Sequence, residues 1–69
     1  MTEPLRIVIE SSLQIAWDFL EATGEIEDRQ QTAEILLGTI KTLVLRGEHR
    51  RLMLSNRAIE AFREFKQAA

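Results

Sequence analysis

The apolar residues of this chain recur at helical spacing in three segments, and this spacing constrains its fold more than any other feature. Gly24 and Gly47 separate the segments, and glycine commonly follows the last residue of a helix, where the backbone is left-handed. The sequence therefore predicts an all-α fold, a three-helix bundle in one domain over residues 1–69. The expected helices span residues 3–22, 29–46 and 55–66.

Residues suited to begin a helix precede each segment. Thr2 is the expected N-cap of the first helix, with Pro4 in the first turn, where its missing N–H costs nothing. Asp28 is the expected N-cap of the second helix and Ser55 that of the third. For two short tracts the sequence leaves an alternative open. Residues 5–9 have strand-like side chains, so a short strand is the alternative to helix there, and residues 48–54 suit either a short helix or an irregular link.

The small size of the chain predicts self-association. With 69 residues and no cysteine, it has neither a large core nor a disulfide to stabilise it. A single core in a chain this short rarely supplies more than about 3–5 kcal/mol, so oligomerisation is the expected additional source of stability.

Two of the expected helices have more apolar surface than one core needs. On the first helix an apolar arc covers about half the circumference, interrupted only by Ser12, where about 100° is enough to face a core. Its members are Leu5, Val8, Ile9, Leu13, Ile15, Ala16, Phe19, Leu20 and Ala22. The second helix has a main apolar face and, almost opposite, a second uncharged strip. The main face holds Ala33, Leu36, Leu37, Ile40, Leu43 and Val44, and the strip holds Ile35, Gly38, Thr42 and Leu45.

This excess surface predicts a homodimer, with a groove for another protein's helix as the alternative. Gly38 supports close packing, because glycine inside a helix costs about 1 kcal/mol relative to alanine and another backbone approaching there would compensate. Trp17, at the edge of the first arc, suits the core or an interface better than ligand stacking. The candidate interface residues are Trp17, Ile35, Gly38, Thr42 and Leu45. In the third helix Ala58, Ile59, Ala61, Phe62 and Phe65 are expected to face inward.

Charge is distributed unevenly along the chain. Residues 1–40 contain two basic and eight acidic side chains, a net charge of −6, whereas residues 41–69 contain seven basic and three acidic ones, a net charge of +4. We expect the basic residues to form a solvated link or to pair with acids of the other helices, and contact with a nucleic acid or an acidic partner is the alternative. The candidates are Arg46, His49, Arg50, Arg51, Asn56 and Arg57. Ser55, Asn56 and Arg57 at the start of a second helix would suit a helix-turn-helix, although the turn before them is short and the pI is about 5.3.

The sequence contains few residues suited to catalysis or to binding a metal or a cofactor. Cysteine and tyrosine are absent, His49 is the only histidine, and no glycine-rich phosphate loop occurs. Glu25, Glu27 and Asp28 lack the spacing of a calcium loop and better suit the positive end of the second helix. We expect no enzyme activity, no metal and no cofactor.

The expected role is therefore a small non-catalytic protein-interaction or regulatory adaptor domain that acts as a homodimer. The alternative is a small nucleic-acid-binding regulator that uses residues 46–57. No apolar run approaches the length of a membrane span and the first residues do not resemble a signal peptide, so we expect no membrane contact and a cytoplasmic location.

Overall fold

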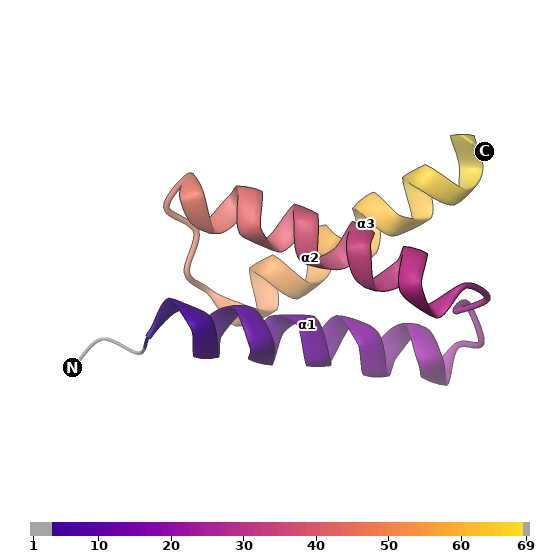
Figure 1. Ribbon diagram of the computed structural model, residues 1–69, viewed down its shortest axis with the longest axis horizontal. Coiled ribbons are helices and arrows are strands. Elements are labelled where there is room, and N and C mark those ends of the chain that lie inside the picture. The colour runs from indigo at the N-terminus through magenta and orange to yellow at the C-terminus, as the bar shows by residue number, and fades with distance from the viewer. Residues whose placement is uncertain (1–3, 69) are drawn as a thin grey trace.

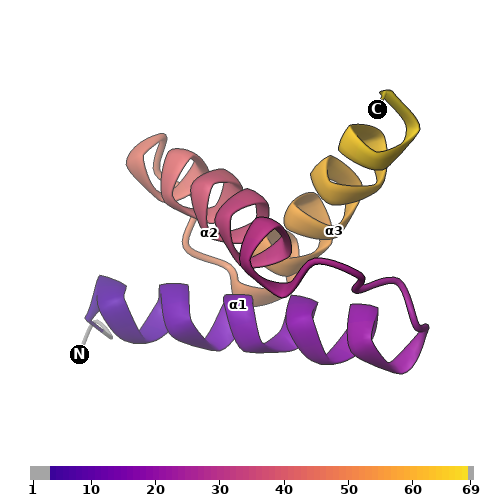
Figure 2. The same ribbon diagram turned by 45° about the vertical axis from the view of Figure 1, so that its right-hand side comes forward.

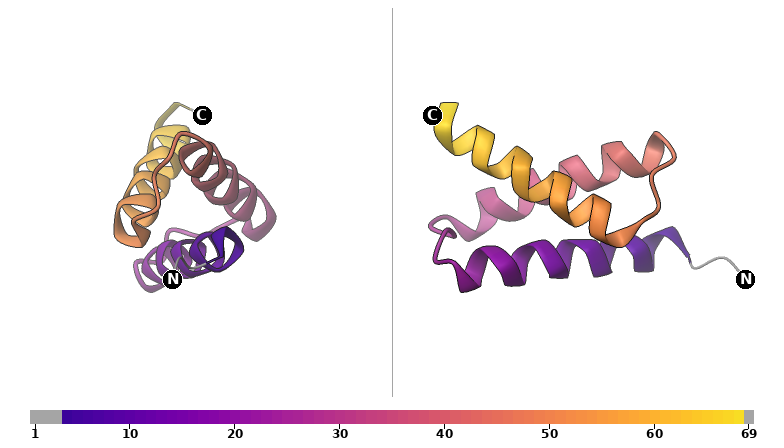
Figure 3. Two further views of the ribbon diagram at one scale, coloured as in Figure 1. Left: turned by 90° about the vertical axis from the view of Figure 1, so that its left-hand side faces the viewer. Right: turned by 180° about the vertical axis from the view of Figure 1, so that it is seen from behind.

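The computed structural model describes residues 4–68 and shows three helices, α1 (Leu5–Ala22), α2 (Arg29–Leu45) and α3 (Arg51–Ala68) (Figure 1). These residues contain no strand, so the predicted all-α class is confirmed and residues 5–9 form the first turns of α1. α2 returns antiparallel to α1, and α3 crosses the pair obliquely, its C-terminal end leaning away from α1 (Figure 2). Seen end-on, the three helices form the corners of a triangle (Figure 3).

Glycine ends the first two helices as the sequence predicts. Gly24 has a φ of 73° and Gly47 a φ of 101°, both in the left-handed region. After α1, the Gly24 and Glu25 N–H groups donate to the carbonyls of Glu21 at 3.1 Å and Leu20 at 2.9 Å. The same pair of backbone bonds follows α2 at Gly47. α1 and α2 therefore each end in a Schellman motif, which satisfies carbonyls left without helical partners.

The helix starts agree with the predictions less uniformly. Asp28 is the N-cap of α2, and its carboxylate accepts a 3.0 Å hydrogen bond from the Gln31 N–H. Pro4 occupies the N-cap position of α1, and no side-chain hydrogen bond caps that end. The expected cap Thr2, and Glu3 where that helix was expected to begin, lie outside the described residues.

The third helix begins at Arg51, so the prediction that Ser55 is its N-cap is wrong. Ser55 is buried in the second turn of α3, and its hydroxyl donates to the Leu52 carbonyl at 3.0 Å. Leu54 is also fully buried, and this extends the apolar period of α3 toward its N-terminus. Residues 51–54 therefore belong to α3, and only residues 48–50 form the link after Gly47.

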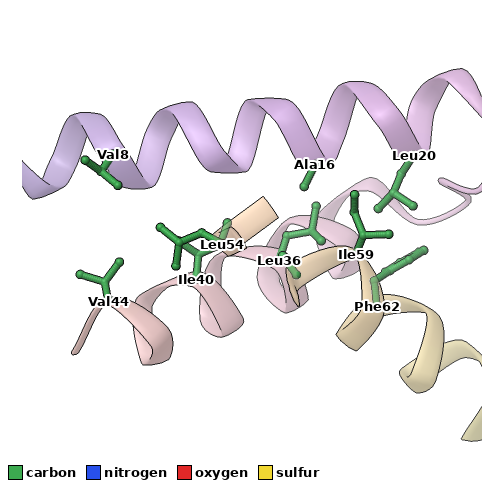
Figure 4. Packing of buried hydrophobic residues seen from close by; sticks show 10 residues of the cluster. Val8, Ala16, Leu20, Leu36, Ile40, Val44, Leu54, Ile59 and Phe62 are labelled. Carbon is green, nitrogen blue, oxygen red and sulfur yellow. The ribbon is translucent and has the colours of Figure 1, made fainter. Parts of the chain in front are cut away.

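The core lies along the line where the three helices meet (Figure 4). Its buried apolar members are Val8, Ala16, Leu20, Leu36, Ile40, Val44, Leu54, Ala58, Ile59 and Phe62. In α1 and α2 the buried positions recur every fourth residue, at 8, 12, 16 and 20 and at 32, 36, 40 and 44. Rows of this spacing form the ridges that interdigitate in the commonest class of helix packing.

Each helix contributes one buried hydroxyl to this core. Ser12, Thr32 and Ser55 are at most 1% exposed. Each hydroxyl donates to a carbonyl three or four residues earlier in the chain, at 2.8 Å from Ser12 and 2.7 Å from Thr32. Because a buried polar group costs little once it is hydrogen-bonded, Ser12 continues the core row that it was expected to interrupt.

Several side chains of the predicted apolar faces lie partly in solvent. Leu5, Ile15, Phe19 and Ala22 of α1 are exposed, and so is Phe65 of α3. Two neighbouring helices cover only the middle of an apolar arc this wide. Phe65 lies where the C-terminal part of α3 leans away from α1, and it remains 42% exposed.

Candidate functional site

Exposed apolar side chains gather where α1 and α3 lie side by side. Ile15 is 38% exposed, Phe19 44% and Leu52 68%. With the buried Ile59, they line an open hollow of about 310 Å³ between the two helices, which we call the α1–α3 groove. Ser55, Asn56, Glu60 and Arg63 complete its lining. The groove presents apolar surface with a polar rim, the usual form of a site that receives a helix.

Arg63 lies at one end of this groove, held by an acidic residue from the link between α1 and α2. The Glu25 carboxylate accepts hydrogen bonds from the Arg63 Nε at 2.9 Å and Nη2 at 2.8 Å. The guanidinium lies 5.4 Å from the centre of the Phe19 ring, within range of a cation–π contact. The Arg63 hydrogen bonds, assisted by the Thr23 hydroxyl, lower the pKa of Glu25 to about 2.

Basic residues line a second hollow, of about 610 Å³, at the start of α3. We call it the basic hollow; its lining is His49, Arg50, Arg51, Leu52, Met53 and Asn56. The structure thus brings together four residues that the sequence singled out, at positions 49, 50, 51 and 56. Leu52 and Asn56 line both this hollow and the α1–α3 groove, so the two are continuous.

Glu48 orients one arginine of the basic hollow. Its carboxylate accepts from the Arg50 backbone N–H at 3.1 Å and from the Arg50 guanidinium at 3.0 Å through both Nε and Nη2. The Arg50 side chain lowers the pKa of Glu48 to about 2, with backbone hydrogen bonds adding to this effect. Glu48 in turn raises the pKa of Arg50.

Two other predicted basic residues lie outside this hollow. Arg57 pairs with Glu60 at 3.8 Å on the exposed surface of α3, and Arg46 lies beside the outer surface of α2. Because α3 begins at Arg51, residues 55–57 lie inside α3 and not at its start, where the helix-turn-helix alternative placed them. Any nucleic-acid contact would need a different geometry.

Three of the predicted dimer residues share one surface. Ile35, Gly38 and Thr42 line an open hollow on α2 of about 550 Å³, together with Glu34, Thr39, Leu43 and Arg46. We call the strip of Ile35, Gly38, Thr42 and Leu45 the α2 outer face. Leu45, at the end of α2, is 88% exposed, whereas Ile35 is half-buried and packs partly against the core.

Trp17 belongs to a different part of the molecule. It lines a hollow with Glu10, Leu13 and Gln14 of α1 and packs partly against the core. The Arg29 guanidinium lies 5.0 Å from its ring centre and pairs with Glu21 at 3.3 Å. The structure therefore separates Trp17 from the α2 outer face, with which the sequence grouped it.

The α1–α3 groove was not identified as a site from the sequence. Ile15 and Phe19 belonged to the wide apolar arc of the first helix, and Leu52 to a tract expected to be either a short helix or an irregular link. The width of that arc was the available signal, since half a circumference exceeds what one core covers. The position at which α3 crosses α1 decides which flank of this arc remains exposed.

The described part of the chain shows no candidate metal site and no candidate membrane span. Within residues 4–68, no three histidine or acidic side chains converge as metal ligands. None of the helices there combines the length and apolar character needed to cross a bilayer. Comparison with known protein families, with curated proteins and with solved structures found no match to this chain.

Proposed function

We propose that this protein is a non-catalytic protein-interaction or regulatory adaptor module that acts as a homodimer through the α2 outer face. The observation that carries the proposal is Gly38. It lies mid-helix on an exposed surface, and apart from its chain neighbours and the nearby backbone of its own helix, no described atom lies within 4 Å of where its Cβ would stand. No tertiary contact among the described residues therefore offsets its cost of about 1 kcal/mol relative to alanine.

A second copy of α2 crossing at Gly38 would offset that cost, since the absent side chain lets two helix backbones approach closely. Thr42, one turn further on, already donates its hydroxyl to the Gly38 carbonyl at 2.9 Å. Burying this hydroxyl in an interface therefore leaves no donor unsatisfied.

Leu45 supports the same interface, since it is the most exposed of the large apolar side chains described. A two-fold axis on α2 would bury this residue from both copies, and full burial of a leucine contributes about 1.5–3 kcal/mol. Association also adds stability to a bundle whose core is small.

Sedimentation equilibrium of the wild type and of Leu45→Glu and Gly38→Leu tests the proposal. The wild type is expected to have the mass of a dimer at about 100 µM, within the range where weak dimers populate. Both variants are expected to be monomeric with unchanged helical circular dichroism, because one places a charge and the other a bulky side chain at the crossing.

Lys41→Ala is the matched control, because Lys41 is exposed on α2 beside this strip and outside its hollow. It should remain dimeric. A wild-type protein that is monomeric at this concentration, or variants that dimerise like the wild type, would show that the α2 outer face is not a homodimer interface.

A further inference from the structure

The last turns of α3 lie beyond the hydrophobic core. Residues 63–68 are all exposed, and the last buried side chain of the helix is Phe62. Phe65, the one large apolar side chain among these residues, is 42% exposed, and α3 leans away from α1 there (Figure 2). Because burial of apolar surface is the main source of stability, this segment gains little from packing.

Charged contacts join this segment to residues 23–28, the link between α1 and α2. The Arg63 guanidinium donates two hydrogen bonds to the Glu25 carboxylate, at 2.9 Å and 2.8 Å. Three residues further on, the Lys66 Nζ donates to the Glu27 carboxylate at 2.8 Å and to the Glu25 carbonyl at 3.3 Å. Both basic side chains of residues 63–68 therefore bind the link.

The neighbouring charges have other roles. Arg29 pairs with Glu21 at 3.3 Å, and the Asp28 carboxylate accepts from the Gln31 N–H at the start of α2. Glu64, the one acid among residues 63–68, is exposed. The contact between the segment and the link therefore consists of two pairs of opposite charge.

We propose that residues 63–68 form an electrostatic latch, a segment that charge holds to the link and that opens without unfolding the rest of the bundle. Each exposed ion pair contributes little, so opening this segment costs much less free energy than unfolding the core. Dissolved salt screens exposed charges, so high ionic strength favours the open form.

Opening of the latch changes one end of the α1–α3 groove. Arg63 lines that groove, and its guanidinium lies 5.4 Å from the centre of the Phe19 ring. When the segment opens, Arg63 leaves this ring and more of Phe19 is exposed. The latch includes no residue of the α2 outer face, so it does not depend on the proposed dimer.

Amide hydrogen exchange of the full chain, followed residue by residue by NMR at constant pH, tests the latch. Residues 63–68 are expected to exchange faster than the core residues Leu36 and Ile40. Raising NaCl from about 20 mM to about 500 mM should accelerate exchange in residues 63–68 alone, by about threefold or more.

A variant of the link identifies the cause of this exchange. Glu25→Gln combined with Glu27→Gln should give residues 63–68 the fast exchange at low salt and remove its dependence on salt. These substitutions leave α3 itself unchanged, so its helix propensity is the same. Arg57→Gln is the matched control, because it removes an exposed pair with Glu60 that lies within α3 and does not reach the link.

Lys66→Ala is a second variant that keeps the link intact. Alanine favours the helix at least as well as lysine, so faster exchange in Lys66→Ala would come from the lost contacts with the link. Wild-type exchange rates in both the link variant and Lys66→Ala would show that the end of α3 frays by itself, which would overturn the proposal. Exchange of residues 63–68 at the rate of the core residues would also overturn it, because the segment would then open only with the whole bundle.

Discussion

At the scale of single residues, small side chains decide how closely the helices approach. Ala16 is fully buried in the middle of α1 and points toward the space between Leu36 and Ile59 (Figure 4). Replacing it with leucine adds three carbons where the packing leaves no room, so we expect Ala16→Leu to destabilise the fold by about 1–3 kcal/mol. Ala22→Leu, on the exposed end of the same helix, should change stability by less than about 0.5 kcal/mol. Urea unfolding measures both; a more stable Ala16→Leu would indicate looser packing than the structure shows.

At the scale of elements, a proline substitution tests whether α3 begins at Arg51. Asn56 is exposed, so substituting it removes no core packing. Because it lies in the second turn of a helix that begins at Arg51, Asn56→Pro should cost about 3 kcal/mol or more through a lost backbone bond and a ring clash. Asn56→Ala should cost little. Thermal unfolding followed by circular dichroism compares the two; a well-tolerated proline would place the start of the helix near residue 56 after all.

At the scale of the whole molecule, ion pairs fasten the link between α1 and α2 to the last turns of α3. Arg63 holds Glu25, and the Lys66 Nζ donates to Glu27 at 2.8 Å and to the Glu25 carbonyl at 3.3 Å. The Lys66 hydrogen bond lowers the pKa of Glu27. These contacts join segments about forty positions apart in sequence, and exposed pairs of this kind each contribute little to stability.

The depressed pKa values predict how stability depends on pH. The pKa of Glu25 is about 2 in the folded protein against an ordinary 4.5, so its stabilising contribution is complete above about pH 4.5. That contribution is lost as the pH falls toward 2. We expect Glu25→Gln to lower the melting temperature at neutral pH and to lose less on acidification than the wild type. Glu48, with a similarly low pKa, should keep part of the acid dependence. Identical pH profiles for wild type and variant would show that the Glu25–Arg63 pair does not contribute.

The positions of the helices could largely be predicted, because they depend on interactions between residues close together in sequence. Gly24 and Gly47 end helices through their own backbone freedom, and Asp28 caps α2 through a residue three positions away. The error at Ser55 has the same local origin. A serine before a polar stretch is a good cap by composition, but the buried Leu54 extends the helix toward the N-terminus, and that burial is a tertiary effect.

The sequence by itself determined the helical class, two of the helix ends and an amount of apolar surface too large for one small core. These follow from interactions within a few residues and from the periodicity of each segment. Only the tertiary structure decided which flank of α1 stays exposed, that Leu52 joins Ile15 and Phe19 in one groove, and that Trp17 lies apart from the α2 outer face. The physical reason is that a helix wheel gives the angle of each side chain about its own axis, whereas exposure depends on how the axes cross.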